Sequence, residues 1–460
     1  MDGRLPRTAP EAVGLPPGAV LGLIEGAAEQ KLELHSLMVL RHGKVAAEGW
    51  WEPYKPPYRH LLYSLSKSFT SSAVGFAVAE GLIRLDDDVL DFFPEHAPPD
   101  PSPNLMAMTI WHLLTMTTGQ DEDDVLGTVR SGLPWEKAFL ARPVPNEPGS
   151  KFFYNSVATY MLSSIVHRTS GVDLMQYLKP RLLDPLCIEE ATTTRSPEGV
   201  VCGGWGMSIA TESIAKFGQL YLQKGVWNGE QLLPKGWAEE ATRKQVENGV
   251  DPDSDWDQGY GFQFWRSRFG AFRGDGMYGQ FCVVDAPKDL VVAITANSEV
   301  LQPILNLVWK MVEELEKPGT RTQAEMEEKL SSLVIAGPAG EPRSPLQAEV
   351  QGVTYESTGE DREANVTFDF SGDSCSILLN RADGPKNLEV GIGQWKEGKY
   401  GEARVASWGA WTSESQFEFR VQYLEEPLHA TIRADFEGRL VTITRECRAD
   451  SEVLVIGQSP

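Results

Sequence analysis

A serine and a lysine three residues apart stand at the predicted start of an apolar helix. Ser64 and Lys67 follow an extended segment, and apolar residues continue at helical spacing up to Gly81. Side chains at positions i and i+3 share a helix face, so the hydroxyl and the amine are expected to meet. A serine beside a neutral lysine is a nucleophile with its base, and burial near the positive end of a helix dipole favours the neutral amine.

The same spacing occurs a second time, at Ser213 and Lys216. A serine and a lysine at this spacing are expected about once by chance in a chain of this length. Because Ser213 falls in the first turns of an amphipathic helix, we expect Thr211 to cap that helix and Lys216 to lie on its exposed face. Nucleophilic chemistry is therefore assigned to Ser64 and Lys67. The alternative is that Ser64 only caps its helix and Lys67 is exposed.

Strands on both sides of a helical region must position this pair. Strands are predicted over residues 36–41, 45–50, 259–265, 279–285 and 290–297. Helices are predicted over residues 19–30, 64–81, 109–116, 155–169, 211–223, 237–245 and 303–316. This order predicts an α+β domain over residues 1–318, in which one antiparallel sheet is assembled from both ends of the segment and a helical insertion forms a second lobe.

The remainder of the chain differs in composition and in predicted secondary structure. Residues 319–345 are rich in Pro, Gly, Glu and Lys and are interpreted as a linker with one short helix near residues 324–333. Short strands separated by turns follow over residues 346–460. This pattern predicts a small all-β barrel or sandwich as a separate C-terminal domain.

Five segments in a fixed order resemble the serine β-lactamase-related hydrolases. They are Tyr63–Thr70, Leu82–Val89, Thr109–Gly119, Pro148–Ser156 and Gly203–Met207. The family includes class C β-lactamases, penicillin-binding carboxypeptidases, D-aminopeptidases and family VIII carboxylesterases, and the resemblance covers about residues 10–315. It implies a β-lactamase/transpeptidase-like fold, and the C-terminal domain is similar to the lipocalin-like or barrel appendages of some members.

The resemblance also implies further site residues. Family members use a tyrosine of a Y-x-N element as a proton relay, which falls on Tyr154, with Asn155 and Ser156 completing the substrate-binding element. Serine stands at position 156 where the family usually has asparagine. The hydrogen bond that positions an amide substrate in lactamases is therefore not expected in its usual form. An ordinary core position at a helix start is the alternative for Tyr154.

The third family element, K-T-G or H-x-G on a strand beside the site, matches Gly274, Asp275 and Gly276 as a further substrate-binding segment. It lacks the basic residue that helps to bind a substrate carboxylate, which argues against penicillins, cephalosporins and peptidoglycan stems. Arg273 is adjacent, but strand alternation points it away from the Gly274 face. The alternative is a plain turn between strands. The resemblance places the oxyanion hole at the backbone N–H groups of Ser64 and Met277.

Aromatic residues of the same region are candidates for the walls of an apolar acyl pocket, with core packing as the alternative. They are Trp205, Trp256, Tyr260, Phe262 and Trp265.

Composition and missing motifs exclude other classes of function. The 42 basic and 65 acidic residues give a net charge of −23, which disfavours nucleic acid and anionic membranes as partners. The seven histidines form no zinc-binding pattern, and P-loop and G-x-S-x-G motifs are missing, so neither a metal nor an organic cofactor is expected. Five scattered cysteines, no signal-like N-terminus and no long apolar segment indicate free thiols and a cytoplasmic location.

Together these features predict a serine hydrolase that cleaves an ester or an amide through an acyl-enzyme on Ser64, with Lys67 and Tyr154 moving the proton. A small-acyl ester or an amide or peptide of D-configuration is the expected substrate, and a homo-oligomer is an expected assembly. Two alternatives stay open. One is an acyltransferase on the same fold, and the other is a non-catalytic binding protein related to penicillin-binding proteins.

Overall fold

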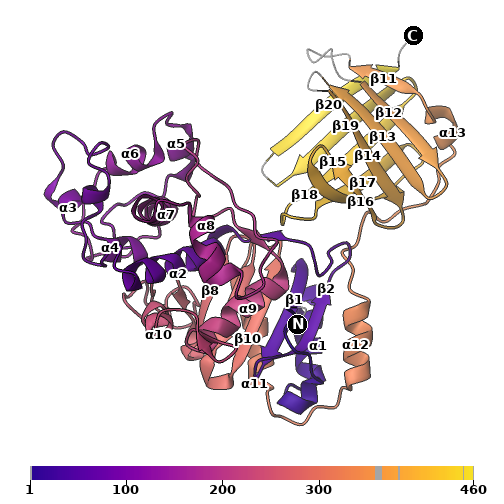
Figure 1. Cartoon of the computed structure of the whole chain (residues 1–460). Helices are drawn as coiled ribbons and strands as arrows, with labels where there is room; N and C mark the ends of the chain where they lie inside the picture. The colour runs from indigo at the N-terminus through magenta and orange to yellow at the C-terminus, as the bar shows by residue number, and fades with distance from the viewer. Residues whose placement is uncertain (1–2, 358–364, 382–383, 449, 459–460) are drawn as a thin grey trace. The chain divides into compact units, whose positions relative to one another are not determined.

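The computed structural model describes residues 3–357, 365–381, 384–448 and 450–458 of the chain (Figure 1). The chain divides into two compact units: Met1–Gly49 with Arg59–Ser331, and Trp50–Tyr58 with Ser332–Pro460. The first unit includes α12 (Gln323–Ser331), which packs against α1 (Pro17–Glu29) although it lies in the segment predicted as a linker. We call the two units the mixed α/β unit and the barrel unit.

The mixed α/β unit is built on a six-stranded sheet whose order is β2-β1-β10-β9-β8-β7. The strands are β1 (Leu34–Arg41), β2 (Lys44–Trp50), β7 (Trp265–Arg266), β8 (Phe272–Gly276), β9 (Gln280–Asp285) and β10 (Leu290–Ala296). β1 from the N-terminal part pairs antiparallel with β10, with Leu37 opposite Ile294. All residues of β1, β9 and β10 are buried, so both faces of the central strands are covered. The prediction of one antiparallel sheet assembled from both ends is confirmed.

Helices cover this sheet and form the second lobe. α9 (Thr211–Leu222) packs against β1, β9 and β10, and Gly218 of α9 lies where a side chain would meet Cys282 and Val291. α1 and α11 (Gln302–Glu313) pack against each other. The lobe is formed around α2 (Ser66–Ala79) and α7 (Ser156–Ser170), which pack together.

Shorter helices complete this unit. They are α3 (Pro103–Met106), α4 (Ile110–Leu114), α5 (Val125–Arg130), α6 (Trp135–Leu140), α8 (Leu174–Leu178) and α10 (Trp237–Thr242). The lobe helices α4, α5, α6 and α8 each pack against α7. Two-stranded ribbons connect the parts: β3 (His60–Leu61) with β4 (Ser208–Ile209), and β5 (Val226–Trp227) with β6 (Glu230–Gln231).

Three local predictions are wrong. The strand predicted over residues 259–265 forms only at its end, in β7, because Gln263 has a left-handed φ of 65° and its backbone bonds to Leu114 and Ser68 on two helices. Lys216 is not on an exposed face: only 5% of it is exposed, and its Nζ donates to the carbonyl of Cys187 at 3.2 Å. Thr211 does not cap α9, since its hydroxyl shares a hydrogen bond with Ser36.

The barrel unit holds a ten-stranded sheet in the order β14-β13-β12-β11-β20-β19-β18-β17-β16-β15. Its strands are β11 (Thr354–Ser357), β12 (Asn365–Ser371), β13 (Ser374–Arg381), β14 (Gly384–Ile392), β15 (Lys396–Tyr400), β16 (Ala403–Trp411), β17 (Gln416–Tyr423), β18 (His429–Glu437), β19 (Leu440–Cys447) and β20 (Asp450–Gln458). α13 (Gln347–Val350) precedes β11. A parallel pairing of β14 with β16 nearly closes the sheet, as the predicted all-β barrel requires.

The early segment Trp50–Tyr58 is part of the barrel unit. Tyr54 is 5% exposed and packs with Ile335, Ala406 and Leu424. Its hydroxyl accepts a hydrogen bond from Gln422 Nε2 at 2.8 Å. These contacts explain why a segment distant in the sequence joins this unit.

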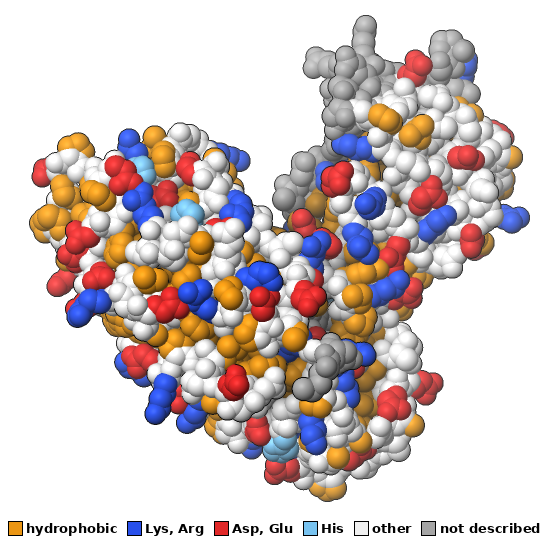
Figure 2. Space-filling model, viewed as in Figure 1, with side chains coloured by type: hydrophobic (Ala, Val, Ile, Leu, Met, Phe, Trp, Pro, Cys, Tyr) orange, Lys and Arg blue, Asp and Glu red, His pale blue; other side chains and the backbone are white. Residues whose placement is uncertain are grey.

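The charged side chains on the surface and the state of the cysteines can be compared with the sequence. Basic side chains lie among acidic ones on the face shown in Figure 2. All five cysteines are free thiols, as expected. Among the described residues, no helix is both long enough and apolar enough to cross a membrane.

Candidate active site

Ser64 lies in a single 3₁₀ turn, Tyr63–Leu65, immediately before α2. Tyr63 has a left-handed φ of 47°, which a tyrosine rarely adopts, so the surrounding contacts must hold the turn. Ser66 Oγ donates to the carbonyl of Tyr63 at 2.6 Å and accepts from the N–H of Met207 at 3.2 Å. The turn thereby presents Ser64, which is partly exposed, one turn before Lys67.

Lys67 lies in the first turn of α2 and is 1% exposed. Its Nζ contacts Ser64 Oγ at 2.9 Å, Ser156 Oγ at 3.2 Å and the carbonyl of Gly204 at 2.7 Å. Burial lowers the pKa of Lys67 to about 7, although the negative charges of Asp123 and Asp275 oppose this shift. The amine is therefore substantially neutral near neutral pH, and it touches the hydroxyl that it would deprotonate.

Asp123 is a site residue that sequence reasoning missed. Its carboxylate accepts hydrogen bonds from the backbone N–H of Ser156 at 2.7 Å and from Ser156 Oγ at 3.0 Å. Ser156 thus bridges Lys67 to a carboxylate on an exposed loop. The acidic run at residues 121–124 was visible in the sequence, but no spacing rule connects it to Ser156.

Asn155, predicted to bind substrate, is used within the protein. It caps α7 by accepting from the N–H of Ala158 at 3.0 Å, and its Nδ2 donates to Gln120 Oε1 at 2.9 Å. The residue is 0% exposed. Its amide is therefore engaged in positioning the start of α7, whereas its neighbour Ser156 contacts Lys67.

Tyr154 lies beside the pair. Lys67 Nζ is 4.8 Å from the centroid of the Tyr154 ring, and this ring stacks on Trp265 at 5.3 Å between centroids. Burial and the negative charge of Asp275 raise the pKa of Tyr154, while a hydrogen bond with Ser64 acts in the opposite direction. The phenol consequently keeps its proton near neutral pH.

Gly274 and Gly276 lie in β8, where the strand approaches the start of α2. A Cβ at Gly274 would come within 2.3 Å of Leu65 Cδ1, so the basic side chain of the family pattern has no room there without movement. A Cβ at Gly276 would be 2.0 Å from the carbonyl oxygen of Leu62 and 3.2 Å from the backbone nitrogen of Ser64. The backbone of β8 thus lies directly against the backbone of the turn that carries Ser64.

Arg273 does not take the place of the basic residue that the family pattern has at position 274. It is 0% exposed, its Nε donates to Asp275 Oδ2 at 2.9 Å, and its guanidinium lies 4.5 Å from the Trp256 ring centroid. Burial raises the pKa of Asp275, and the Arg273 charge opposes that shift. Arg273 therefore neutralises Asp275 inside the protein.

Met277 follows β8 directly. Its carbonyl accepts from Gln280 Nε2 at 3.0 Å, and the carbonyl of Gly276 accepts from the N–H of Gly279 at 3.2 Å. These bonds fix the turn that follows Gly276, whose own Cβ position lies 3.2 Å from the backbone nitrogen of Ser64. The oxyanion hole at the N–H groups of Ser64 and Met277 stays a prediction.

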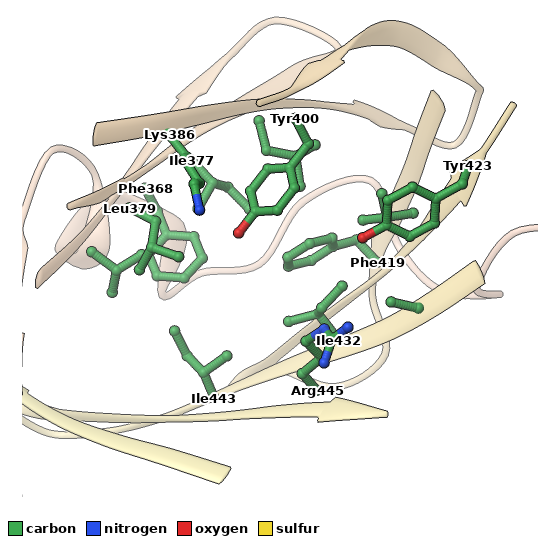
Figure 3. Close-up of a pocket in the computed structure, with 14 residues that line it drawn as sticks. Phe368, Ile377, Leu379, Lys386, Tyr400, Phe419, Tyr423, Ile432, Ile443 and Arg445 are labelled. Carbon is green, nitrogen blue, oxygen red and sulfur yellow. The ribbon is translucent and has the colours of Figure 1, made fainter. Parts of the chain in front are cut away.

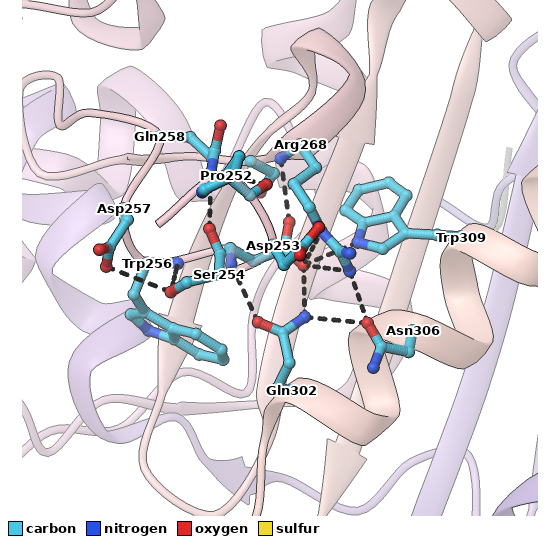
Figure 4. Close-up of polar contacts among 12 residues, drawn as sticks. Pro252, Asp253, Ser254, Trp256, Asp257, Gln258, Arg268, Gln302, Asn306 and Trp309 are labelled. Atoms are coloured by element: carbon cyan, nitrogen blue, oxygen red, sulfur yellow. Dashed lines mark hydrogen bonds and ion pairs between the residues drawn. The ribbon is translucent and has the colours of Figure 1, made fainter. Parts of the chain in front are cut away.

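A polar network anchors the loop that holds Trp256 (Figure 4). Asp255 is 0% exposed, and its Oδ2 accepts from Gln302 Nε2 at 2.6 Å and from Trp309 Nε1 at 2.9 Å on α11. Arg268 Nη2 forms an ion pair with the same carboxylate at 2.9 Å. Trp256 hydrogen-bonds Asp275, so this network positions the Trp256 ring beside Arg273 and Asp275.

The structure separates the other predicted aromatic residues. Tyr260 and Trp265 lie together at 4.9 Å near Tyr154. Phe262 packs on Trp237 in the core, and Trp205 stacks on Trp135 in the lobe.

Ser213 and Lys216, the second serine and lysine pair, contact different partners. Ser213 Oγ donates to Glu190 Oε1 at 2.7 Å, and Lys216 donates elsewhere. Among the residues that the structure describes, no group of three or more His, Cys, Asp or Glu side chains could hold a metal ion.

Comparisons with known proteins bear on the family and the fold of the chain. Residues 23–308 match the family model described as Beta-lactamase. The 6-aminohexanoate-dimer hydrolase of Paenarthrobacter ureafaciens is 26% identical over 291 residues, which cover 57% of this chain and 73% of that protein.

Two solved structures share the fold at low identity. An octameric penicillin-binding protein homologue from Pyrococcus abyssi has a TM-score of 0.53 at 17% identity, covering 95% of this chain and 99% of that chain. EstCE1, a hydrolase with promiscuous acyltransferase activity, has a TM-score of 0.52 at 17% identity, and the match covers 65% of this chain and 98% of that chain. The predicted fold, a β-lactamase/transpeptidase-like unit followed by a barrel-like sheet, is confirmed.

Proposed function

Because the chain belongs to the beta-lactamase family, we propose that it is a serine hydrolase that cleaves an ester or an amide through an acyl-enzyme on Ser64. The proposal rests on the 2.9 Å contact between Lys67 Nζ and Ser64 Oγ. The pKa of about 7 makes Lys67 a base that is neutral enough to take the serine proton. With the amine neutral, the hydroxyl is the donor in this contact.

The proposed reaction has two halves. Ser64 Oγ forms a bond to the substrate carbonyl carbon as its proton passes to Lys67, and the N–H groups of Ser64 and Met277 stabilise the oxyanion. Tyr154, protonated because its pKa is raised, donates a proton to the leaving oxygen or nitrogen and recovers one from Lys67. The bond from the carbonyl carbon to the leaving group breaks. Water then attacks the carbonyl carbon of the ester on Ser64, the bond from that carbon to Ser64 Oγ breaks, and a proton from the water passes through Lys67 to Ser64 Oγ as the acid leaves.

The charges around the pair favour substrates without a carboxylate near the reacting carbonyl. Gly274 provides no base, Arg273 is committed to Asp275, and Asp123 adds a negative charge beside Ser156. Small-acyl esters and amides of amino acids, including D-amino acids, meet this condition better than β-lactams. The name of the 6-aminohexanoate-dimer hydrolase also points to an amide between amino-acid units.

The test is hydrolysis of a short-chain p-nitrophenyl ester by the wild type, Ser64→Ala and Ser213→Ala. We expect a burst of p-nitrophenol followed by steady turnover in the wild type and in Ser213→Ala, and loss of both phases in Ser64→Ala. Equal rates in the wild type and Ser64→Ala would overturn the proposal and favour the non-catalytic binding protein. Parallel assays with D-alanine p-nitroanilide and a chromogenic cephalosporin rank the substrate classes.

Two further points belong to the same proposal. Adding an alcohol or amine acceptor to the ester assay shows whether acyl transfer competes with hydrolysis, a test suggested by EstCE1, which is described as a hydrolase with promiscuous acyltransferase activity. A homo-oligomer is also proposed, since the Pyrococcus abyssi homologue, which matches nearly the whole chain, is octameric. Light scattering after size exclusion measures the assembly.

A further inference from the structure

A surface pocket on the mixed α/β unit has basic walls. It measures about 440 Å³, and its lining includes Arg243, Lys244 and Arg266. The cavity inside the barrel unit differs, because its lining is mostly apolar (Figure 3). Sites for small molecules typically measure about 300–1,000 Å³. The pocket on the mixed α/β unit therefore has the size of a ligand site and walls that favour a negative charge.

Arg266, the last residue of β7, is the cation of this pocket that has no carboxylate partner. Its Nη1 donates to the carbonyl of Thr242 at 2.8 Å, and its Nη2 donates to the carbonyl of Gly270 at 2.7 Å. In the part of the chain that the structure describes, no carboxylate forms an ion pair with this guanidinium. Burial lowers the pKa of Arg266, as expected for a half-buried charge that is not neutralised. The two carbonyls thus orient the guanidinium without balancing its charge.

The other basic residues around the pocket each have an acidic partner. The ion pairs are Arg243 with Glu240 at 2.6 Å, Lys244 with Glu247 at 2.7 Å, and Arg268 with Asp255 at 2.9 Å. Because these charges balance in pairs, one positive charge remains, that of Arg266. A ligand with a single negative charge is therefore the complement of this pocket.

An acidic loop, residues 251–257, adjoins the pocket through Gln258 (Figure 4). Asp257 accepts hydrogen bonds from Ser254 Oγ at 3.2 Å and from the backbone N–H of Val250 at 3.1 Å. Asp251 accepts from the backbone N–H of Asp253 at 2.9 Å. These carboxylates bind groups of their own loop, and burial alone accounts for the lowered pKa of Arg266. The loop consequently leaves the charge of Arg266 uncompensated.

An exposed aromatic ring also lines the pocket. Phe269 is 63% exposed, and its φ of 60° is one that a phenylalanine rarely adopts. The turn that carries it is closed by the bond from Arg266 to Gly270 and by the N–H of Ser267, which donates to the carbonyl of Ala271 at 2.9 Å. A ring held in this way beside a cationic pocket offers a stacking surface to a planar group.

The pocket lies apart from the chemistry at Ser64. Trp265 and Arg266 are neighbours on β7, so strand alternation directs their side chains to opposite faces. The Trp265 ring stacks on Tyr154 of the candidate active site. Arg266 and its pocket are therefore on the face of β7 that is turned away from Tyr154.

We propose that this pocket binds a carboxylate that is attached to a planar aromatic group. A guanidinium has five N–H donors, and the carbonyls of Thr242 and Gly270 accept from two of them. The ligand carboxylate accepts from the remaining donors of Arg266, and its aromatic group packs against the Phe269 ring. Occupancy of this site does not depend on the proposed hydrolase activity.

The test is isothermal titration calorimetry of the full chain with 1-naphthoate and with 1-naphthalenemethanol, which has the same rings and no charge. We expect a Kd for naphthoate below about 1 mM. Naphthoate should bind at least about 10-fold more tightly than the alcohol, because its contact with Arg266 is charge-assisted. Inorganic phosphate, which has no ring, should bind at least about 10-fold more weakly than naphthoate.

Two arginine variants locate the binding. Arg266→Met should reduce the preference for naphthoate over the alcohol to less than about threefold. Arg130→Met removes an arginine from an exposed position on α5 and should leave the preference unchanged. Naphthoate bound elsewhere, including at Ser64, would keep its affinity in Arg266→Met.

Two variants of the exposed Phe269 test the aromatic wall independently of the fold around Arg266. Asn and Asp both tolerate a left-handed φ. Phe269→Asn should weaken naphthoate and the alcohol by similar factors, whereas Phe269→Asp should also abolish the preference for naphthoate, because it brings a carboxylate to the pocket. Circular dichroism and thermal unfolding confirm the fold of each variant. No naphthoate binding, equal affinity for the alcohol, phosphate bound as tightly as naphthoate, or an unchanged preference in folded Arg266→Met or Phe269→Asp would overturn the proposal.

Discussion

Replacing Asp123 with asparagine should move the acid limb of the pH–rate profile to lower pH. In the proposed mechanism Lys67 must be neutral, so kcat/KM for ester hydrolysis rises with pH through the pKa of about 7. The Asp123 charge opposes the lowering of this pKa. Removing that charge should lower the pKa of Lys67 further, and the variant should remain active at a pH where the wild type is protonated and inactive.

The structure limits the size of this effect. Ser156 Oγ lies 3.2 Å from Lys67 Nζ and 3.0 Å from Asp123 Oδ2, so the two charges are at most about 6 Å apart. At that separation the Coulomb energy is about 2.8 kcal/mol at an effective dielectric of 20 and about 0.7 kcal/mol in bulk water, or roughly 2 and 0.5 pKa units. Because Asp123 is exposed, water and salt screen its charge. The expected shift in the pKa of Lys67 is therefore about one unit.

The assay is kcat/KM for a neutral p-nitrophenyl ester from pH 5 to pH 9 in the wild type, Asp123→Asn and Glu122→Gln. Glu122 is exposed on the same loop and contacts Asn155 through its carbonyl oxygen, so Glu122→Gln removes an equal charge while keeping that contact. The Asp123→Asn shift should shrink at high salt. An acid limb that stays in place or moves to higher pH in Asp123→Asn, or that moves equally in both variants, would contradict the role assigned to Asp123.

Three further variants test the surroundings of the nucleophile. Tyr154→Phe should lower kcat by about 10²–10³-fold while the acid limb stays within about half a unit, because the proton relay is lost and the base is kept. Gly276→Ala should lower kcat at least about 10-fold, because its Cβ would be 2.0 Å from the carbonyl oxygen of Leu62. Asp255→Ala should lower the free energy of unfolding at pH 7 by about 3–5 kcal/mol, because Arg268 loses its buried partner.

Each of these variants has its own check. Stopped-flow pH profiles measure the effect of Tyr154→Phe on kcat. A normal kcat in this variant would show that the phenol takes no part in the mechanism. For Gly276→Ala, wild-type kcat with wild-type thermal stability would show that β8 tolerates a side chain. For Asp255→Ala, urea unfolding measures stability, and an unchanged midpoint would contradict the assigned role of the network.

The pH dependence of the Asp255 effect has a fixed sign. Burial alone would raise the pKa of Asp255, but hydrogen bonds from Gln302, Trp309 and Arg268 outweigh it and lower the pKa. A lowered pKa stabilises the fold above the unfolded value, and this stabilisation is lost as pH falls through the folded value. The stability difference between wild type and Asp255→Ala should therefore shrink below about pH 4.

The sequence predicted those parts of the site that lie close together in the chain. Ser64 and Lys67 are one helical turn apart, and the periodicity of the following residues was strong enough to predict α2. Gly274 and Gly276 were matched to a strand beside the site, and β8 is that strand. Strand alternation, which pointed Arg273 away from the Gly274 face, also agrees with its buried pairing with Asp275.

Long-range contacts could not be predicted in the same way. Asp123 meets Ser156 across 33 residues, and no local pattern links an exposed acidic loop to the start of α7. The strand expected over residues 259–265 failed because tertiary hydrogen bonds hold Gln263 in a left-handed conformation. Lys216 was expected in solvent, but inside the protein the carbonyl of Cys187 accepts a hydrogen bond from its amine. The barrel cavity depends on ten strands together and has no sequence signature.

Acylation of Ser64 is the step on which the proposed function depends. It can be measured by mass spectrometry of the full chain after rapid acid quench of the reaction with a p-nitrophenyl ester, followed by peptide mapping. We predict one acyl group per chain on the peptide that contains Ser64, and no adduct on that peptide in Ser64→Ala. Full turnover with no acylated peptide, or an adduct located at Ser213 or another residue, would contradict the assignment of Ser64 as the nucleophile.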